Sequence, residues 1–361
     1  MIQTVVFSLI PLCALIAVAE TVLRLGGWGD SPITPYVLPG EPEGLVQLDE
    51  NLFWSLRPDQ EVVFFGVPTR TNSLGLRGPE VRRRRDREFR ILSLGESSAF
   101  GNGVGDAETY AALLEAHLNR AAGEDRFTVI NGGVPAYTSF QSLVYLKERG
   151  LALEPQMLLF YHEANDLLPS YLRASDSSVV GMNLSDPERH ADRLRRTHRR
   201  LLAWSAIYRF IRYRLALSQI EQFQQTVGEE FRPAWPVQVG EERRSLKFPF
   251  RVRLEERIEI LKEFLRLSRE HAFEFVLIHP SYRDSKPHSC VFTEFSRANR
   301  VPLFEVHPLL HPEDGPHHFL DAMHPTRRGH ERIADALFNF LVEKRLVPLK
   351  RNSGQKAPGN A

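Results

Sequence analysis

Cysteine is scarce in this chain, and so is net charge. Only Cys13 and Cys290 occur among 361 residues, which excludes a disulfide framework and a cysteine-rich zinc site. The 46 basic residues nearly balance the 45 acidic ones, so the formal net charge of +1 gives no argument for a nucleic-acid partner. The glycine-rich run from Gly95 to Gly105 lacks the Gly-x-Gly-x-x-Gly order of a dinucleotide site. We therefore expect that the protein binds neither nucleic acid nor a cofactor.

Charged side chains are absent from Ile2 to Ala19, and Glu20 and Arg24 end this apolar run. The run is long enough for a marginal membrane span, so residues 1–24 are predicted to be an N-terminal transmembrane anchor. A cleaved signal peptide is the alternative, because Ala17-Val18-Ala19 resembles a small-x-small cleavage site. The absence of Lys and Arg before the run favours the anchor and leaves its orientation open.

Apolar runs alternate with amphipathic stretches from residue 89 onward. Such alternation is typical of βαβ units that build a parallel sheet covered on both faces. We predict a three-layer α/β/α domain of flavodoxin-like type with a parallel sheet of about five strands. The expected strands are Ile91–Leu94, Phe127–Ile130, Met157–Tyr161, Phe273–Ile278 and Leu303–Val306, and the expected helices are Glu108–Ala121, Phe140–Arg149, Leu254–His271 and Arg327–Glu343.

Chemically active side chains follow the ends of these strands. Ser97 comes directly after the first strand, Ala136 and Asn165 follow the second and third, and Asp321 and His324 precede the last helix. Ligands bind beyond the carboxyl ends of the strands in such sheets, so these segments are expected to meet at one edge. A serine, a histidine and an aspartate there supply a nucleophile, a base and a group that orients the base.

Four sequence blocks in this order resemble the SGNH (GDSL-type) hydrolase family, in particular its membrane-anchored bacterial members. The blocks are Leu94–Gly101, Asn131–Tyr137, Glu163–Asp166 and Asp321–His324. The resemblance covers roughly residues 70 to 345 and implies a catalytic triad of Ser97, Asp321 and His324. It also implies an oxyanion hole made by the backbone N–H groups of Ser97 and Ala136 and the side-chain amide of Asn165.

The blocks depart from the family pattern at three positions. Glu96 stands where the family has Asp, Glu163 where the third block usually has Gly, and Ala136 where the oxyanion Gly is expected. Ala136 keeps its N–H but is strained if the position requires a positive φ. Ser98 is an alternative nucleophile, although the block spacing favours Ser97. Pro325 fits the first position of a helix, which places His324 at or just before the N-cap.

The organisation of the chain follows from these assignments. Between 168 and 250 the alternation of strands and helices stops, and a basic stretch from Glu188 to Gln219 with interleaved aromatic residues indicates a helical insertion or lid. The predicted parts are residues 1–24 (anchor), 25–88 (linker and small β extension), 89–345 (hydrolase-like domain with the 168–250 insertion) and 346–361 (tail).

Two further clusters have competing interpretations. Arg82 to Arg87 is either a solvated loop or a contact with anionic lipid. A histidine-rich and acidic run precedes the Asp321 block, but its spacing fits no defined metal site, so no metal is expected. Its members are His311, Glu313, Asp314, His317 and His318.

We interpret the protein as a serine esterase, a hydrolase acting on ester bonds through an acyl-enzyme. One alternative is an acyl or acetyl transferase, or a deacetylase, acting on cell-surface polysaccharide. The other is a catalytically weak glycan- or partner-binding protein, favoured by the three departures. The expected partners are an ester or O-acylated carbohydrate substrate and, through residues 1–24, a membrane with the catalytic domain outside the cytoplasm.

Overall fold

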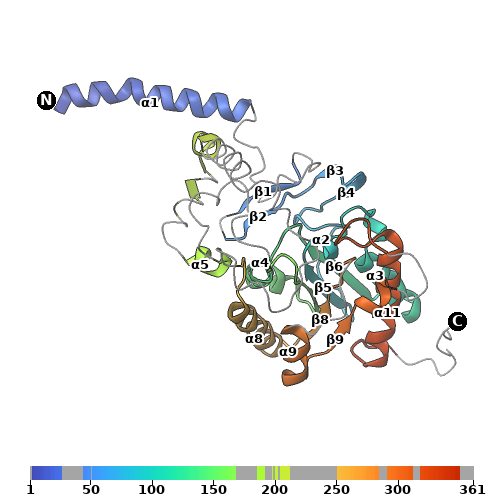
Figure 1. Ribbon diagram of the computed structural model, residues 1–361. Helices are drawn as coiled ribbons and strands as arrows, with labels where there is room; N and C mark the ends of the chain where they lie inside the picture. The colour runs from blue at the N-terminus through green and yellow to red at the C-terminus, as the bar shows by residue number, and fades with distance from the viewer. Residues whose placement is uncertain are drawn as a thin grey trace.

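A five-stranded parallel sheet with helices on both faces forms the body of the protein, and two small hairpins precede it (Figure 1). The computed structural model describes residues 2–26, 44–49, 51–167, 185–191, 250–283, 291–311 and 318–349, with a few positions between 197 and 211. Nearly all of the predicted insertion and the whole predicted tail beyond residue 349 lie outside these residues.

The sheet has the strand order β6-β5-β7-β8-β9, and all neighbours are parallel. This is the flavodoxin-like order 2-1-3-4-5, in which ligands bind beyond the carboxyl ends of the strands where the order reverses. That place lies at β5 and its neighbour β7. The strands are β5 (Phe89–Gly95), β6 (Phe127–Gly133), β7 (Met157–Tyr161), β8 (Glu274–His279) and β9 (Leu303–Glu305).

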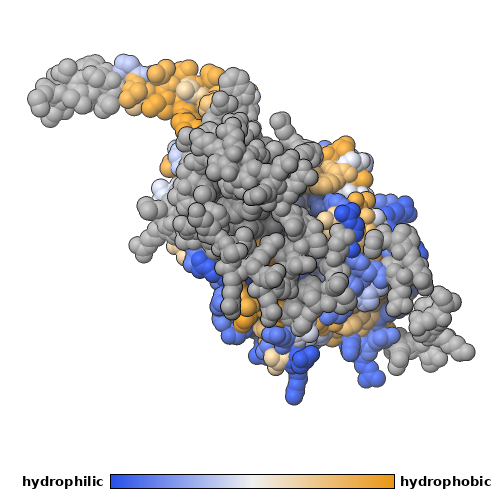
Figure 2. Space-filling model, in the orientation of Figure 1, coloured by the Kyte–Doolittle hydropathy of each residue, from blue (hydrophilic) through white to orange (hydrophobic). Residues whose placement is uncertain are grey.

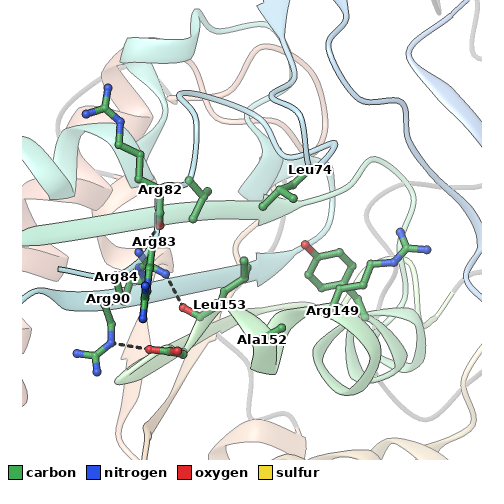
Figure 3. Close-up of a pocket in the computed structure, with 11 residues that line it drawn as sticks. Leu74, Arg82, Arg83, Arg84, Arg90, Arg149, Ala152 and Leu153 are labelled. Atoms are coloured by element: carbon green, nitrogen blue, oxygen red, sulfur yellow. Dashed lines mark hydrogen bonds and ion pairs between the residues drawn. The ribbon is translucent and has the colours of Figure 1, made fainter.

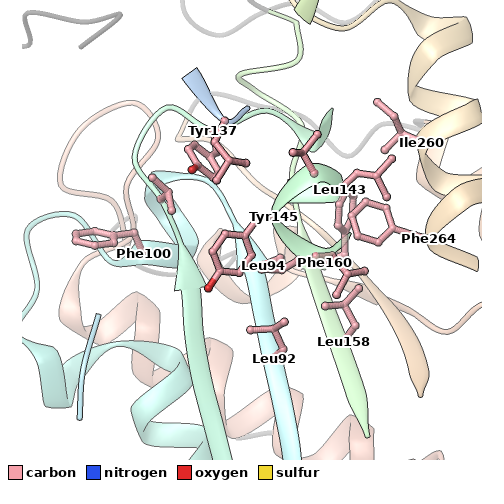
Figure 4. Close-up of a cluster of buried hydrophobic side chains, with 14 of the residues drawn as sticks. Leu92, Leu94, Phe100, Tyr137, Leu143, Tyr145, Leu158, Phe160, Ile260 and Phe264 are labelled. Atoms are coloured by element: carbon pink, nitrogen blue, oxygen red, sulfur yellow. The ribbon is translucent and has the colours of Figure 1, made fainter. Parts of the chain in front are cut away.

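The strands are apolar throughout because both of their faces are covered. Along β7, Leu158 and Phe160 point into one core cluster and Leu159 into the other, as the alternation of a strand requires. Figure 4 shows the first cluster, where Phe160 packs against Phe264 with ring centroids 4.7 Å apart. Burial of large side chains on both faces fixes the register of the central strands.

Helices flank the sheet in two layers. On one face lie α3 (Tyr110–Ala122) and α11 (Arg327–Glu343), and on the other lie α4 (Ser139–Tyr145) and α8 (Leu254–Glu270). The first residues of α3 and α11 are fixed by capping: Thr109 accepts from the N–H of Ala112, and Thr326 from that of Gly329. Shorter elements are α2 (Ser97–Phe100), α5 (Asp186–Ala191), α9 (Val291–Asn299) and α10 (His307–Leu310).

The predicted β extension consists of two antiparallel hairpins, β1–β2 (Val46–Asp49, Phe53–Leu56) and β3–β4 (Glu61–Phe64, Val67–Arg70). The β1–β2 hairpin is buried and its side chains belong to the core cluster that also contains Phe160. The hairpins are therefore packed onto the body of the protein and do not form a separate unit.

Helix α1 (Ile2–Leu25) extends away from the body, and Figure 2 shows apolar surface along it. Its Glu20 carboxylate accepts hydrogen bonds from the backbone N–H groups of Ala206 and Ile207, at 2.7 and 3.0 Å. Among the described residues, no helix is both long enough and apolar enough to span a membrane. The structure thus does not show the transmembrane anchor predicted at residues 1–24.

The predicted strands and helices of the body are confirmed with small shifts at their ends, and α11 has the predicted limits. His324 was predicted at the N-cap of the last helix or just before it, and it lies two residues before the N-cap; the predicted place of Pro325 as the first helical residue is wrong. Thr326 occupies the N-cap of α11, and Pro325 instead forms a β-bridge with Phe319 before the helix begins. The hydrogen bond that Thr326 accepts outweighs the preference of proline for the first helical position.

Candidate active site

Ser97 is the first residue of α2, at the turn that leaves β5. The turn is tight: a Cβ added to Gly95 would lie 2.3 Å from Cβ of Ala99 and 2.8 Å from the carbonyl oxygen of Tyr161. Only glycine fits there. The serine is 6% exposed at the carboxyl edge of the sheet, where a substrate is expected to bind.

Asp321, His324 and Ser97 are joined by hydrogen bonds. The Ser97 Oγ lies 2.8 Å from Nε2 of His324, and Nδ1 of His324 lies 2.6 Å from Oδ2 of Asp321. The other Asp321 oxygen accepts the backbone N–H groups of Met323 and His324, at 2.8 and 2.9 Å. The carboxylate therefore holds the loop and the imidazole ring together, which fixes the ring opposite the serine.

The pKa of Asp321 is low in spite of its burial. Burial alone raises the pKa of this carboxyl, but the hydrogen bonds and charge of His324 and the backbone N–H of Met323 outweigh burial and lower the pKa to about 2. Asp321 is therefore ionised at neutral pH and stabilises an imidazolium that forms at His324.

Ser98 does not share this position. Its hydroxyl donates to the carbonyl oxygen of Met323 at 3.2 Å, so it ties α2 to the loop that carries Asp321 and His324. The side-chain amide of Asn102, which sequence reasoning missed, lies 3.4 Å from His324 Nε2. The geometry favours Ser97 over Ser98 as the partner of the base.

Ala136 adopts the left-handed conformation, with a φ of 64°, that was predicted to strain a residue with a Cβ atom. It lies in a β-turn closed by a 3.1 Å hydrogen bond from the N–H of Tyr137 to the carbonyl of Val134. Asn165 is buried beside it, and its side-chain amide donates to the carbonyl of Tyr137 at 3.0 Å. An amide NH₂ carries two hydrogens, so this bond uses one of two donors. The two predicted oxyanion residues are thus linked through one turn.

Glu96 and Glu163, two of the departures from the family pattern, are both buried. Burial raises the pKa of Glu96 to about 8, and the nearby carboxylates of Asp166 and Glu163 add to the rise. Glu96 Oε2 accepts the backbone N–H of Asn165 at 3.1 Å. Glu96 therefore fixes the backbone of the third block beneath the serine.

Side chains from outside the four blocks also reach the site. The Phe65 ring, just after β3, packs edge-on against the His324 ring with centroids 5.6 Å apart. Trp54 of β2 donates to the carbonyl of Pro135 at 3.3 Å, and Arg251 donates to that of Ala136 at 2.8 Å. No local sequence pattern indicates these contacts, because each joins residues that lie far apart in the chain.

Among the described residues, no three His, Cys, Asp or Glu side chains are grouped to hold a metal ion. His311 Nε2 lies 2.9 Å from the carbonyl of Tyr282 and 3.1 Å from the Ser281 hydroxyl. Residues 312–317 of the histidine-rich run lie outside the described part of the chain.

A cavity of about 460 Å³ lies near the amino ends of β5 and β7 (Figure 3). Arginines dominate its lining, but they have internal partners: Arg84 pairs with Glu154 at 2.9 Å, and Arg90 with Glu88 at 3.1 Å. Arg82 and Arg83 are exposed. Contact of Arg82 and Arg83 with anionic lipid stays a prediction.

Comparison with known proteins gives structural likenesses only. No protein-family model matches the chain. No curated protein matches it either. Among solved structures, a GDSL-like lipase from Bacteroides thetaiotaomicron is 11% identical, covers 73% of this chain and 93% of its own, and has a TM-score of 0.35. The psychrotrophic esterase EstA from Pseudoalteromonas sp. is 14% identical, with coverages of 72% and 99% and a TM-score of 0.39.

A two-domain esterase active on acetylated mannans is 13% identical, covers 73% of this chain and 51% of its own length, and has a TM-score of 0.42. At these identities and TM-scores the likenesses do not assign a family.

Proposed function

We propose that this protein is a serine hydrolase that cleaves ester bonds through an acyl-enzyme. The observation that carries the proposal is the chain of hydrogen bonds from Asp321 through His324 to Ser97, with atom-to-atom distances of 2.6 and 2.8 Å. Nucleophile, base and orienting carboxylate come from two segments more than 200 residues apart, and they meet where a flavodoxin-like sheet binds its ligands.

The geometry supports a two-step reaction. The Ser97 hydroxyl attacks the ester carbonyl while His324 accepts its proton, and Asp321 stabilises the resulting imidazolium. The tetrahedral intermediate collapses when His324 returns the proton to the departing alcohol. Water then repeats the sequence on the acyl-enzyme, which releases the acid and restores Ser97. The Ser97 and Ala136 N–H groups and the Asn165 amide are the donors we assign to the oxyanion.

Water as the acyl acceptor and an ester as the substrate are both part of this proposal. With a sugar hydroxyl in place of water, the same triad would transfer an acyl group to a carbohydrate. With the serine unreactive, the fold would be a binding protein. The strain at Ala136 does not favour the binding protein, because the N–H of a left-handed residue is still a donor.

The test is reaction of the full-length protein with a fluorophosphonate probe, which labels an activated serine. We expect labelling and hydrolysis of short activated esters by the wild type and by Ser98→Ala, and neither by Ser97→Ala. Melting temperatures of both variants should stay within about 3 °C of the wild type. Labelling of Ser97→Ala, or equal loss in both variants, contradicts the assignment. Release of the alcohol that begins only after a sugar acceptor is added, with formation of the acylated sugar, supports the transferase.

We keep membrane attachment through residues 1–24 and a location outside the cytoplasm as predictions of the sequence. The exposed apolar side chains of Leu15, Ile16 and Val18 on α1 support attachment. Extraction of membranes with alkaline carbonate tests the attachment, and the protein should stay in the membrane pellet. Protease added to spheroplasts tests the location, and it should digest the domain that follows α1. Release by carbonate, or complete protection, would show that the prediction is wrong.

A further inference from the structure

We infer that Phe65 and Leu320 form a binding surface for an apolar alcohol group of the ester, which deepens the proposed function and rests on it. The two side chains come from opposite ends of the chain, one from the β3–β4 hairpin and one from the loop before His324. Phe65 is 38% exposed and Leu320 is 50% exposed, so both present apolar surface to solvent. We call them the alcohol-side wall.

The wall is built against the catalytic histidine. The Phe65 ring meets the His324 ring edge-on at 5.6 Å, and the Leu320 N–H donates to the carbonyl oxygen of His324 at 2.8 Å. Gly103 lies between the two side chains: a Cβ there would be 2.5 Å from Leu320 Cδ1 and 4.0 Å from Phe65 Cβ. Phe65 and Leu320 therefore form one continuous surface over Gly103.

The position of the wall assigns it to one half of the substrate. His324 must deliver its proton to the departing alcohol oxygen, so the alcohol half lies beside the imidazole. The carbonyl oxygen points toward its assigned donors at Ala136 and Asn165, so it does not occupy the space beside the imidazole. A surface that contacts His324 therefore touches the alcohol. Because it offers an aromatic ring and an aliphatic side chain, it fits an alkyl or aryl alcohol better than a polyol.

The experiment compares acetate esters of methanol, butanol and hexanol with the full-length protein. All acetates form the same acetyl-enzyme, so differences in kcat/KM among them report the alcohol half alone. We expect kcat/KM to rise by about two- to fourfold per methylene in the wild type. Phe65→Ala and Leu320→Ala should lower kcat/KM for hexyl acetate about tenfold more than they lower it for methyl acetate, so that the slope of the alcohol series falls.

Leu74→Ala is the matched control, because Leu74 is 47% exposed but lines the arginine-rich cavity. It should leave both series unchanged. Ethyl esters of longer acids form the second series, and their slope should be the same in wild type and wall variants. Flattening of the acid series, unchanged slopes in both series, or preference for an acetylated sugar over hexyl acetate overturns the inference. If the wild type hydrolyses no ester and is not labelled by fluorophosphonate, the proposed function falls as well.

A second inference comes from the turn that carries Ala136: we propose that Trp54 is a positioning residue for the oxyanion donor. Pro135 and Ala136 are the central residues of the turn from Val134 to Tyr137. Proline cannot take a positive φ, and Ala136 has φ of 64°, so the turn is type II. An alanine at this place favours type I, which differs from type II by a rotation of the central peptide.

That central peptide contains the Ala136 N–H. The Pro135 carbonyl and the Ala136 N–H belong to one planar unit and point in opposite directions. The Trp54 indole N–H holds the carbonyl at 3.3 Å and thereby sets the direction of the N–H. Arg251 and Asn165 hold the next two carbonyls, at 2.8 and 3.0 Å. Three consecutive carbonyls are thus bound by side chains from three distant segments.

The Trp54 contact is itself supported on two sides. The Tyr137 hydroxyl donates to the Trp54 carbonyl at 2.7 Å, and the Arg251 guanidinium lies 5.7 Å from the centre of the indole ring. Tyr137, the last residue of the turn, thus holds the backbone of Trp54, and Arg251, far along the chain, lies over its ring. This arrangement keeps Ala136 in the type II conformation against its own preference, where a relative with glycine would need no such support.

Removal of the indole N–H tests the inference. We expect Trp54→Phe to lower kcat for a short activated ester by about 10- to 100-fold with KM within about twofold, because one oxyanion donor is lost when the peptide rotates. Glycine favours the type II turn by itself. The double variant Trp54→Phe with Ala136→Gly should therefore recover to within about threefold of Ala136→Gly alone.

Leu56→Val in the same strand is the control, since it removes buried packing without contact to the turn; it should lower the melting temperature and leave kcat unchanged. If Trp54→Phe does not fold, 3-benzothienylalanine at position 54 keeps the ring shape and lacks only the N–H. Unchanged kcat in the variant, or a loss that glycine does not rescue, overturns the inference while the proposed function stands. A wild type without esterase activity removes both.

Discussion

Burial and hydrogen bonding act on the Asp321 carboxyl in opposite directions, and hydrogen bonding prevails. Its two oxygens hold the His324 ring and the backbone of the same loop, which lowers its pKa to about 2. Because the folded-state pKa lies below the unfolded value, the ionised carboxyl stabilises the fold at neutral pH. That contribution is lost as the pH falls from about 4 toward 2.

We predict that Asp321→Asn lowers kcat by about 10²- to 10⁴-fold, because the amide cannot stabilise an imidazolium. His324→Ala should lower kcat as far as Ser97→Ala does, and the double variant no further, since the members of a triad act as one unit. Ester hydrolysis between pH 5 and 9 measures both effects. An unchanged rate and pH profile in Asp321→Asn would show that Asp321 does not orient His324.

At the scale of elements, both hairpins supply side chains that contact the candidate site. The β1–β2 hairpin supplies Trp54 to the Ala136 turn, and the residue after β3 supplies Phe65 to the His324 ring. Helix α1 differs, because its Glu20 carboxylate accepts hydrogen bonds from residues 205–207 and not from Ser97 or His324. Among the described residues, the hairpins thus contact the candidate site, whereas the hydrogen bonds of Glu20 on α1 lead away from it.

We therefore expect deletion of residues 1–26 to leave kcat/KM for a soluble ester within about twofold of the full-length value. The segment at 205–207 loses the Glu20 carboxylate, but neither Ser97 nor His324 contacts it. Fluorophosphonate labelling and ester hydrolysis, measured beside circular dichroism, provide the check. A folded truncation that is no longer labelled would show that α1 shapes the site.

The elements of the body could be predicted because continuous apolar strands and amphipathic helices leave a periodic pattern. The meeting of Ser97, Asp321 and His324 was predictable because the segments that follow the strands of a parallel sheet share an edge. The contacts of Trp54, Phe65 and Arg251 were not, because each joins residues far apart in the chain through a geometry that no local pattern encodes. The N-cap at Thr326 was missed because a proline two residues from a threonine offers two competing starts for one helix.

At the scale of the whole molecule, several ionisable side chains are buried beneath the carboxyl edge of the sheet. Glu96 lies fully buried near the carboxylates of Glu163 and Asp166. Arg257 contacts Asp166 at 3.3 Å, and burial raises the pKa of Asp166 although the charge of Arg257 opposes the rise. Such a cluster links the stability of the fold to pH, because a carboxyl that is neutral when folded ionises on unfolding.

Glu96→Gln tests this link. The folded-state pKa of Glu96 is raised to about 8, so its burial is tolerated below the unfolded value of 4.5 and becomes unfavourable as the pH rises. Between pH 5 and 8 the wild type should lose about 2 to 4 kcal/mol in free energy of unfolding relative to Glu96→Gln, from the cost of about 1.4 kcal/mol per pH unit. Denaturant titrations at pH 5, 6.5 and 8 measure the difference. Parallel curves would mean that Glu96 stays ionised in the folded protein, held by the N–H of Asn165 and unaffected by its acidic neighbours.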